Sequence, residues 1–111
     1  MNFTVEDINK IKLIRCANEK LDALIAPELK SQFLHLSNTG NKNFILDLSN
    51  VKYCDSSGLS ALLVGNRLAN ENSGKLTIFG LQPSVEKIVS ISQLDTVLNI
   101  TKNEEGALNI W

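Results

Sequence analysis

The sequence lacks the features that mark several large classes of protein. Its longest apolar runs are about four residues, far below the ~18 that a membrane-spanning helix needs. Eleven Lys and Arg residues stand against twelve Asp and Glu residues, and a formal net charge of -1 gives no field for nucleic acid or an anionic membrane. Residues 1–4 have neither the basic start nor the apolar middle of a signal peptide. We therefore expect a cytoplasmic protein whose partners are proteins, with no nucleic acid and no membrane among them.

Cysteine and histidine are scarce, with two and one residues respectively. Cys16 and Cys54 lie in apolar runs 38 positions apart, and together with His35 they make no recognisable zinc set. We interpret both as buried thiols in preference to a redox pair or a disulfide. His35 falls beside an apolar helical stripe, which favours a solvated side chain over a ligand or a base. No metal and no cofactor is expected.

The motifs of common enzyme active sites are also absent. Cys54 and Gly58 flank the serine pair at the wrong positions for a G-x-S-x-G elbow, and neither H-E-x-x-H nor a Walker sequence occurs. A hydrolase using Ser56 or Ser57 remains the weakest alternative, because no base is evident. We expect a protein without catalytic activity.

What is present is the pattern of one compact α/β domain spanning residues 1–111, with 43% hydrophobic and 21% charged residues. Apolar residues alternate or run together in strand-like segments, and apolar stripes at helical spacing follow three of them. The predicted strands are 3–6, 11–16, 44–48, 51–54, 75–80 and 96–100, and the predicted helices begin at Pro27, near Leu59 and at Pro83. This order predicts an N-terminal hairpin, then a mixed, mostly parallel sheet of about five strands with helices packed on it.

The C-terminal residues 107–111 turn apolar again after a polar stretch at 103–106. Such a tail either docks on its own domain or meets a partner. Docking is the favoured interpretation, since apolar chain ends usually pack somewhere.

The stretch from Asp55 to Gly65 joins an apolar strand to an apolar helix through small polar residues. Backbone N–H groups at a helix start lack partners, so Ser56 or Ser57 has a purely structural explanation as a helix cap. A serine at an exposed helix start can also accept a phosphoryl group, which adds ~1.5 to 2 negative charges. The helix terminus tolerates that charge, whereas a partner packed on Ser56 would not. This junction therefore predicts either a cap or a switch.

The run from Leu46 to Leu63, with Asp55-Ser56-Ser57-Gly58-Leu59 at its centre, closely resembles the signature of the STAS family, found in anti-sigma factor antagonists and sulphate transporter tails. Two further segments are similar to that family, so the likeness covers almost the whole chain. They are Leu21-Asp22-Ala23 followed by Ala26-Pro27-Glu28-Leu29, and 75–81 followed by Pro83 and Val85.

The resemblance implies a function that the residues alone do not. In antagonists of this family an anti-sigma factor that is a serine kinase phosphorylates the serine after the aspartate, which is Ser56 here. Phosphate abolishes binding and a serine phosphatase restores it. Asp55 and Ser57 would shape the contact, Gly58 would allow close approach, and Asp22 would line the same surface. The alternative is a non-switching STAS subunit of a transport or signalling assembly.

Overall fold

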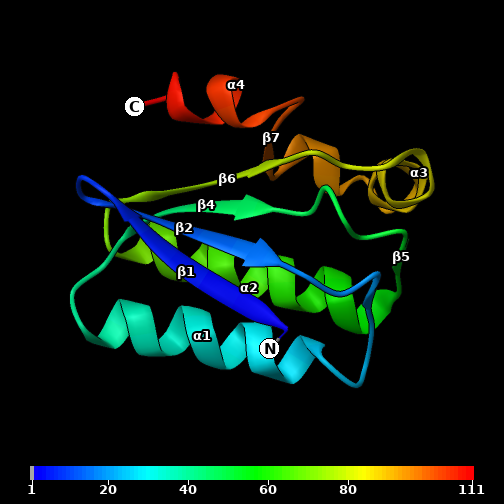
Figure 1. The fold of residues 1–111 in the computed structure, drawn as a ribbon, viewed down its shortest axis with the longest axis horizontal. Coiled ribbons are helices and arrows are strands. Elements are labelled where there is room, and N and C mark those ends of the chain that lie inside the picture. Colours follow the sequence, from blue (N-terminus) through cyan, green and yellow to red (C-terminus); the bar gives the residue numbers. More distant parts are fainter. Residues whose placement is uncertain (1) are drawn as a thin grey trace.

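The computed structural model describes residues 2–111 and shows a five-stranded sheet with helices on both of its faces (Figure 1). Its strands lie in the order β1-β2-β4-β6-β7, namely Phe3–Ile8, Ile11–Cys16, Asn43–Asp47, Lys75–Phe79 and Asn99–Thr101. β1 and β2 are antiparallel, and the remaining neighbours in this sheet are parallel. The predicted α/β class, with a mixed and mostly parallel sheet, is confirmed.

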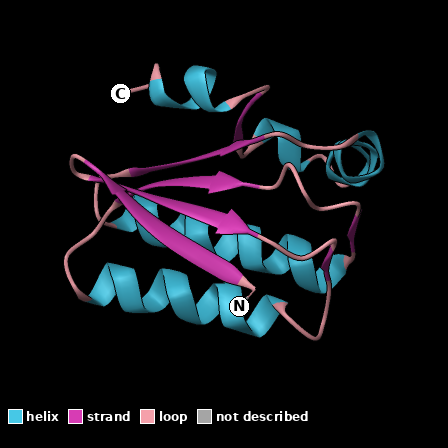
Figure 2. Ribbon diagram, in the orientation of Figure 1, coloured by secondary structure: helices cyan, strands magenta, loops and turns pink. Residues whose placement is uncertain are grey.

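The helices divide unequally between the two faces of the sheet. α1 (Ala26–Asn38) and α2 (Ser56–Glu71) pack on each other below the strands, whereas α4 (Glu104–Leu108) lies above them (Figure 2). α3 (Pro83–Ile91) lies near the end of the sheet to which β2 and β4 run (Figure 1). None of the helices in residues 2–111 is long and apolar enough to cross a bilayer.

The strand alternation expected from the sequence places apolar side chains on both faces. In β4, Phe44 and Leu46 belong to the larger core between the sheet and helices α1 and α2, while Ile45 belongs to a smaller core between the sheet and α4. Phe33 of α1 meets Phe44 edge-on, with ring centroids 5.5 Å apart. β4 is therefore buried on both sides, as its nearly continuous apolar run predicts.

The N-terminal hairpin is confirmed; its second strand has the predicted bounds, and its first strand is two residues longer than predicted. β1 continues to Ile8, so only Asn9 and Lys10 remain in the turn. Asn9 has a φ of 57°, a left-handed conformation that asparagine tolerates better than most residues.

The strand predicted at 96–100 is wrong in position. Leu94–Thr96 form the 3₁₀ helix η1, and the strand begins only at Asn99. The N–H groups of Val97 and Leu98 both bond to the Leu94 carbonyl, which keeps them out of the sheet. Periodicity alone does not reveal such a local turn.

The C-terminal tail docks on the sheet, as its favoured interpretation predicts. Ala107 is buried against Leu13, Ile45 and Phe79, and Leu108 packs on the same cluster. The preceding polar stretch forms the start of α4, which Asn103 caps by accepting a hydrogen bond from Gly106 N–H at 2.8 Å.

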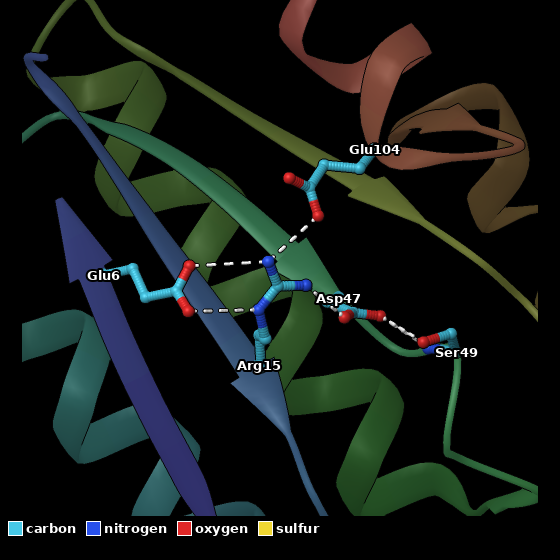
Figure 3. Close-up of polar contacts among 5 residues, drawn as sticks. All are labelled: Glu6, Arg15, Asp47, Ser49 and Glu104. Carbon is cyan, nitrogen blue, oxygen red and sulfur yellow. Dashed lines mark hydrogen bonds and ion pairs between the residues drawn. The ribbon is translucent and has the colours of Figure 1, made fainter. Parts of the chain in front are cut away.

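Arg15 ties this tail to the sheet (Figure 3). Its guanidinium donates to Asp47 Oδ2 at 2.8 Å and to Glu104 Oε1 at 2.9 Å, and it also reaches Glu6 on β1. Asp47 is 7% exposed and accepts two further bonds from Ser49. The hydrogen bond that Arg15 donates to Asp47 raises the pKa of the guanidinium and so favours its charged form.

Replacing Arg15 with methionine is expected to lower the free energy of unfolding by about 1 to 2 kcal/mol, since Asp47 then lies buried without its cation. The amides of α4 should exchange faster, and the fluorescence of Trp111, the only tryptophan, should change as the tail loosens. Urea titration, hydrogen exchange and emission spectra measure these three effects.

Lys52→Met is the matched control for that variant. Lys52 pairs with Glu19 at 3.2 Å, but both side chains are more than half exposed. This change should alter stability by less than about 0.5 kcal/mol. Equal losses in the two variants would contradict a structural role for the Arg15 cluster.

Candidate functional site

The junction singled out in the sequence lies at the edge of the sheet where the parallel strands end. β5 (Tyr53–Cys54) leads directly into α2 and pairs in parallel with β3 (Lys20–Leu21). β3 is not among the strands predicted from the sequence, whereas β5 falls within the predicted strand 51–54. The two-stranded sheet brings the segment after Leu21 alongside the start of α2.

Asp55, and neither serine, caps α2. Its side-chain oxygen accepts a hydrogen bond from Gly58 N–H at 3.1 Å, and its carbonyl accepts from Leu59 N–H. Ser56 is the first residue of the helix and is exposed, while Ser57 is half-buried. The capping explanation for the serines is therefore wrong, and the Ser56 hydroxyl is not needed to complete the helix start.

Gly58 is buried where α2 meets the β3–β5 pair. A Cβ at this position would lie 2.4 Å from the Leu21 carbonyl oxygen and 2.6 Å from the Cys54 sulfur. The close approach that Gly58 permits is thus with the protein's own backbone. Its predicted contact with a partner stays a prediction.

Asp22 directly follows β3, and Asp55 directly follows β5. Asp55 N–H bonds to the Leu21 carbonyl at 3.4 Å, so the two carboxylates occupy corresponding places in adjacent strands. Asp22 Oδ1 accepts from Leu24 N–H at 3.0 Å, and its carbonyl accepts from two N–H groups at the start of α1. The structure thus brings Asp22 beside the junction and shows that it also shapes the turn into α1.

A family model described as STAS domain matches residues 2–107. The chain belongs to the STAS family. An anti-sigma-B factor antagonist from Staphylococcus aureus is 24% identical to it over 106 residues, which are 95% of this chain and 98% of that protein. The family suggested by the sequence is therefore confirmed.

Two solved structures show the same fold. An anti-sigma-factor antagonist (STAS) domain protein from Planctomyces limnophilus has a TM-score of 0.87 at 18% identity, covering 97% of this chain and 96% of that one. The Bacillus cell fate determinant SpoIIAA in its phosphorylated form has a TM-score of 0.75 at 19% identity, covering 98% and 99%. At these identities the likeness establishes the architecture of this STAS domain.

Two exposed apolar residues of the STAS domain border the junction and were not predicted as functional. Leu24, in the turn after Asp22, is 88% exposed, and Tyr53, in β5, is 51% exposed. Both lie in apolar or alternating sequence that looks like core, so only the structure shows that they face solvent. Apolar side chains at the rim of a polar site are suited to contact a protein.

Both thiols of the STAS domain are free and buried, as predicted, with Cys16 1% and Cys54 4% exposed. Burial raises the pKa of both, and the neighbouring Asp55 carboxylate adds to the effect on Cys54, whose pKa is about 12. A thiol that stays protonated is a poor nucleophile and a poor metal ligand. Within residues 2–111 no three metal-binding side chains come together.

The raised pKa of Cys54 predicts a loss of stability in alkali. In the unfolded chain the thiol ionises near its ordinary value of 9.0, whereas the folded protein keeps the proton until about 12. The unfolded state therefore binds fewer protons between these values, and the free energy of unfolding falls as pH rises through them. Urea titrations from pH 8 to pH 11 should show a shallower fall for Cys54→Ala than for wild type; parallel curves would contradict the assignment.

Proposed function

We propose that this STAS domain is an anti-sigma factor antagonist switched by phosphorylation of Ser56. With a free hydroxyl it binds an anti-sigma factor that is a serine kinase, and the bound sigma factor is released. Phosphate on Ser56 ends the binding, and a serine phosphatase restores it. The domain itself supplies no catalysis and uses no cofactor.

The observation that carries this proposal is that the residue capping α2 and the proposed phosphate acceptor are two different residues, Asp55 and Ser56. Asp55 completes the helix start, which leaves Ser56 exposed at the first helical position. Phosphorylation consequently removes no hydrogen bond that the start of α2 requires. The fold can accept the modification without rearranging.

The balance of charge at the junction explains how phosphate acts on a partner rather than on the fold. The helix terminus stabilises an anion by ~0.3 to 1 kcal/mol, and the neighbouring Asp55 carboxylate opposes it. Stability of the domain should therefore change little. A partner that covers Ser56 must bury a doubly charged group beside Asp22 and Asp55, which costs several kcal/mol.

Phosphorylation of Ser56 requires only ATP and a general base, and the kinase supplies both. The Ser56 Oγ attacks the γ-phosphorus of ATP, the bond from that phosphorus to the β–γ bridging oxygen breaks, and ADP leaves. The hydroxyl proton passes to a base of the kinase. Hydrolysis by the phosphatase consumes water and returns serine and inorganic phosphate. The STAS domain contributes an accessible hydroxyl on a rigid helix.

The residues around Ser56 have separate parts in the proposed contact. Asp22, Asp55 and Ser57 supply polar groups at its rim, and Gly58 holds the helix start close to the β3–β5 pair. Leu24 and Tyr53 add the exposed apolar surface that a stable protein contact requires.

The proposal is tested by locating the phosphate. Wild type, Ser56→Ala and Ser57→Ala are incubated with the cognate anti-sigma factor kinase and ATP, and peptides are mapped by mass spectrometry. Wild type and Ser57→Ala should be phosphorylated at residue 56, and Ser56→Ala should remain unmodified. Phosphate only at another residue, or none in any of the three proteins, would overturn the switch.

A further inference from the structure

A groove runs along the outer face of α2, beyond the Ser56 junction. Its walls include Ser60, Leu63, Val64 and Arg67 from α2, and Val97 from the segment after η1. Leu63 is 37% exposed and Val97 is 54% exposed, so apolar surface remains open to solvent. Arg67 and Glu71, paired at 3.5 Å, stand at its far end.

The groove lies on the same side of the helix as the proposed acceptor. Residues four, seven and eleven positions after Ser56 are Ser60, Leu63 and Arg67, and these spacings return to one face of an α-helix. The surface that begins at the Ser56 hydroxyl therefore continues along the same face of α2 into the groove.

A protein that covers Ser56 with an interface of ordinary size also contacts the groove. A specific interface occupies about 800 Å² on each partner, equivalent to a disc of about 16 Å radius. At ~1.5 Å per residue, Leu63 lies about 10 Å beyond Ser56 along α2 and Arg67 about 16 Å beyond it. A contact centred on Ser56 therefore covers Leu63 and ends near Arg67.

The chemistry of the junction makes the groove the more suitable anchor along α2. The first turn offers small polar groups at Ser56 and Ser57, which give orientation and little binding energy. Binding energy concentrates on apolar side chains that fill pockets. In α2 such surface first becomes available at Leu63, opposite Val97.

We propose that this α2 groove is a docking site for the kinase that acts on Ser56. It receives an apolar side chain of that kinase between Leu63 and Val97, with Arg67 and Glu71 facing polar groups at the edge. This inference rests on the proposed function. Docking in the groove holds the kinase over Ser56, and phosphate on Ser56 then ends the binding by making the junction part of the contact unfavourable.

The test compares Leu63→Asp and Val97→Asp, from opposite walls of the groove, with Leu34→Asp on α1. Leu34 is also an exposed helical leucine, at 51%, and lies outside the groove. Binding of each unphosphorylated protein to the cognate kinase is measured by calorimetry. Both groove variants should weaken binding by about tenfold or more, and Leu34→Asp should stay within about twofold of wild type.

Phosphorylation kinetics give a second readout. The groove variants should raise the KM of the kinase for this substrate and leave kcat unchanged, because the Ser56 hydroxyl itself is unaltered. Circular dichroism and thermal melts check that each variant folds. If Leu63→Asp fails to fold, Val97→Asp and Arg67→Glu carry the test.

The outcomes separate this inference from the proposed function. If both groove variants bind the kinase as tightly as wild type does, the groove is not the docking site, and the proposed switch at Ser56 still stands. No binding by wild type overturns both. Sedimentation of each protein alone tests whether the groove instead binds a second copy of this chain. If wild type self-associates and Leu63→Asp is monomeric, while kinase binding is the same for both, the occupant is that second copy and the proposal is wrong.

Discussion

Replacing Ser56 with aspartate is expected to weaken binding to the anti-sigma factor kinase by about a hundredfold or more, since a buried and uncompensated charge costs several kcal/mol. The exposed position of Ser56 at the helix start means that this loss comes from the interface. The free energy of unfolding should change by less than about 1 kcal/mol, because an acidic residue is favourable in the first turn. Calorimetric titration and urea unfolding of the same protein measure the two quantities.

Ser31→Asp is the matched charge control, because Ser31 is an exposed serine of α1 away from the junction. It should bind as wild type does. Ser56→Ala should also bind, and it should do so whether or not ATP is present. Tight binding that survives in Ser56→Asp, or an equal loss in Ser31→Asp, would show that the charge at residue 56 is not what controls the contact.

Replacing Gly58 with alanine is expected to destabilise the domain by about 2 to 3 kcal/mol, although alanine is ordinarily the better helix former by about 1 kcal/mol. The added Cβ would lie 2.4 Å from the Leu21 carbonyl oxygen. That oxygen is main chain, so relief requires β3 to move away from α2. Thermal and urea unfolding should both report the loss, and binding should weaken as the Asp22 turn shifts with β3.

α4 provides an internal control for Gly58. Gly106 follows its cap Asn103 by three residues, as Gly58 follows Asp55, and each glycine N–H donates to its cap side chain, at 2.8 Å and 3.1 Å. A Cβ at Gly106 would come no closer than 3.3 Å to a neighbour. Gly106→Ala should therefore lie within about 0.5 kcal/mol of wild type. If both variants behave alike, the crowding at Leu21 is not the cause.

Much of the fold could be predicted because its elements carry strong periodicity. The alternation at 11–16 and the apolar run at 44–48 identify β2 and β4, and α1 begins one residue before the predicted Pro27. The choice of Ser56 came from the family resemblance. Asp55, Ser56 and Ser57 are all residue types that cap helices, so the sequence alone leaves open which one does.

The elements that were missed are too short to show a period. β3 has two residues, Lys20–Leu21, and is held by its pairing with residues 33 positions later in the chain. η1 depends on Gln93 in a left-handed conformation with a φ of 60°, and that preference is not evident from the residue type. The exposure of Leu24 likewise follows from the turn that Asp22 makes, which only the assembled fold reveals.

The assignment of the cap to Asp55 has a consequence for how such a domain can evolve. Under the proposed function, a lineage that loses its kinase is free to lose the Ser56 hydroxyl, because Asp55 and not Ser56 caps α2. Loss of Asp55 would still cost about 1 kcal/mol whether or not the switch is in use. Selection on the fold and selection on signalling therefore act on different, adjacent codons, and regulation can be gained or lost by a single substitution in an unchanged scaffold.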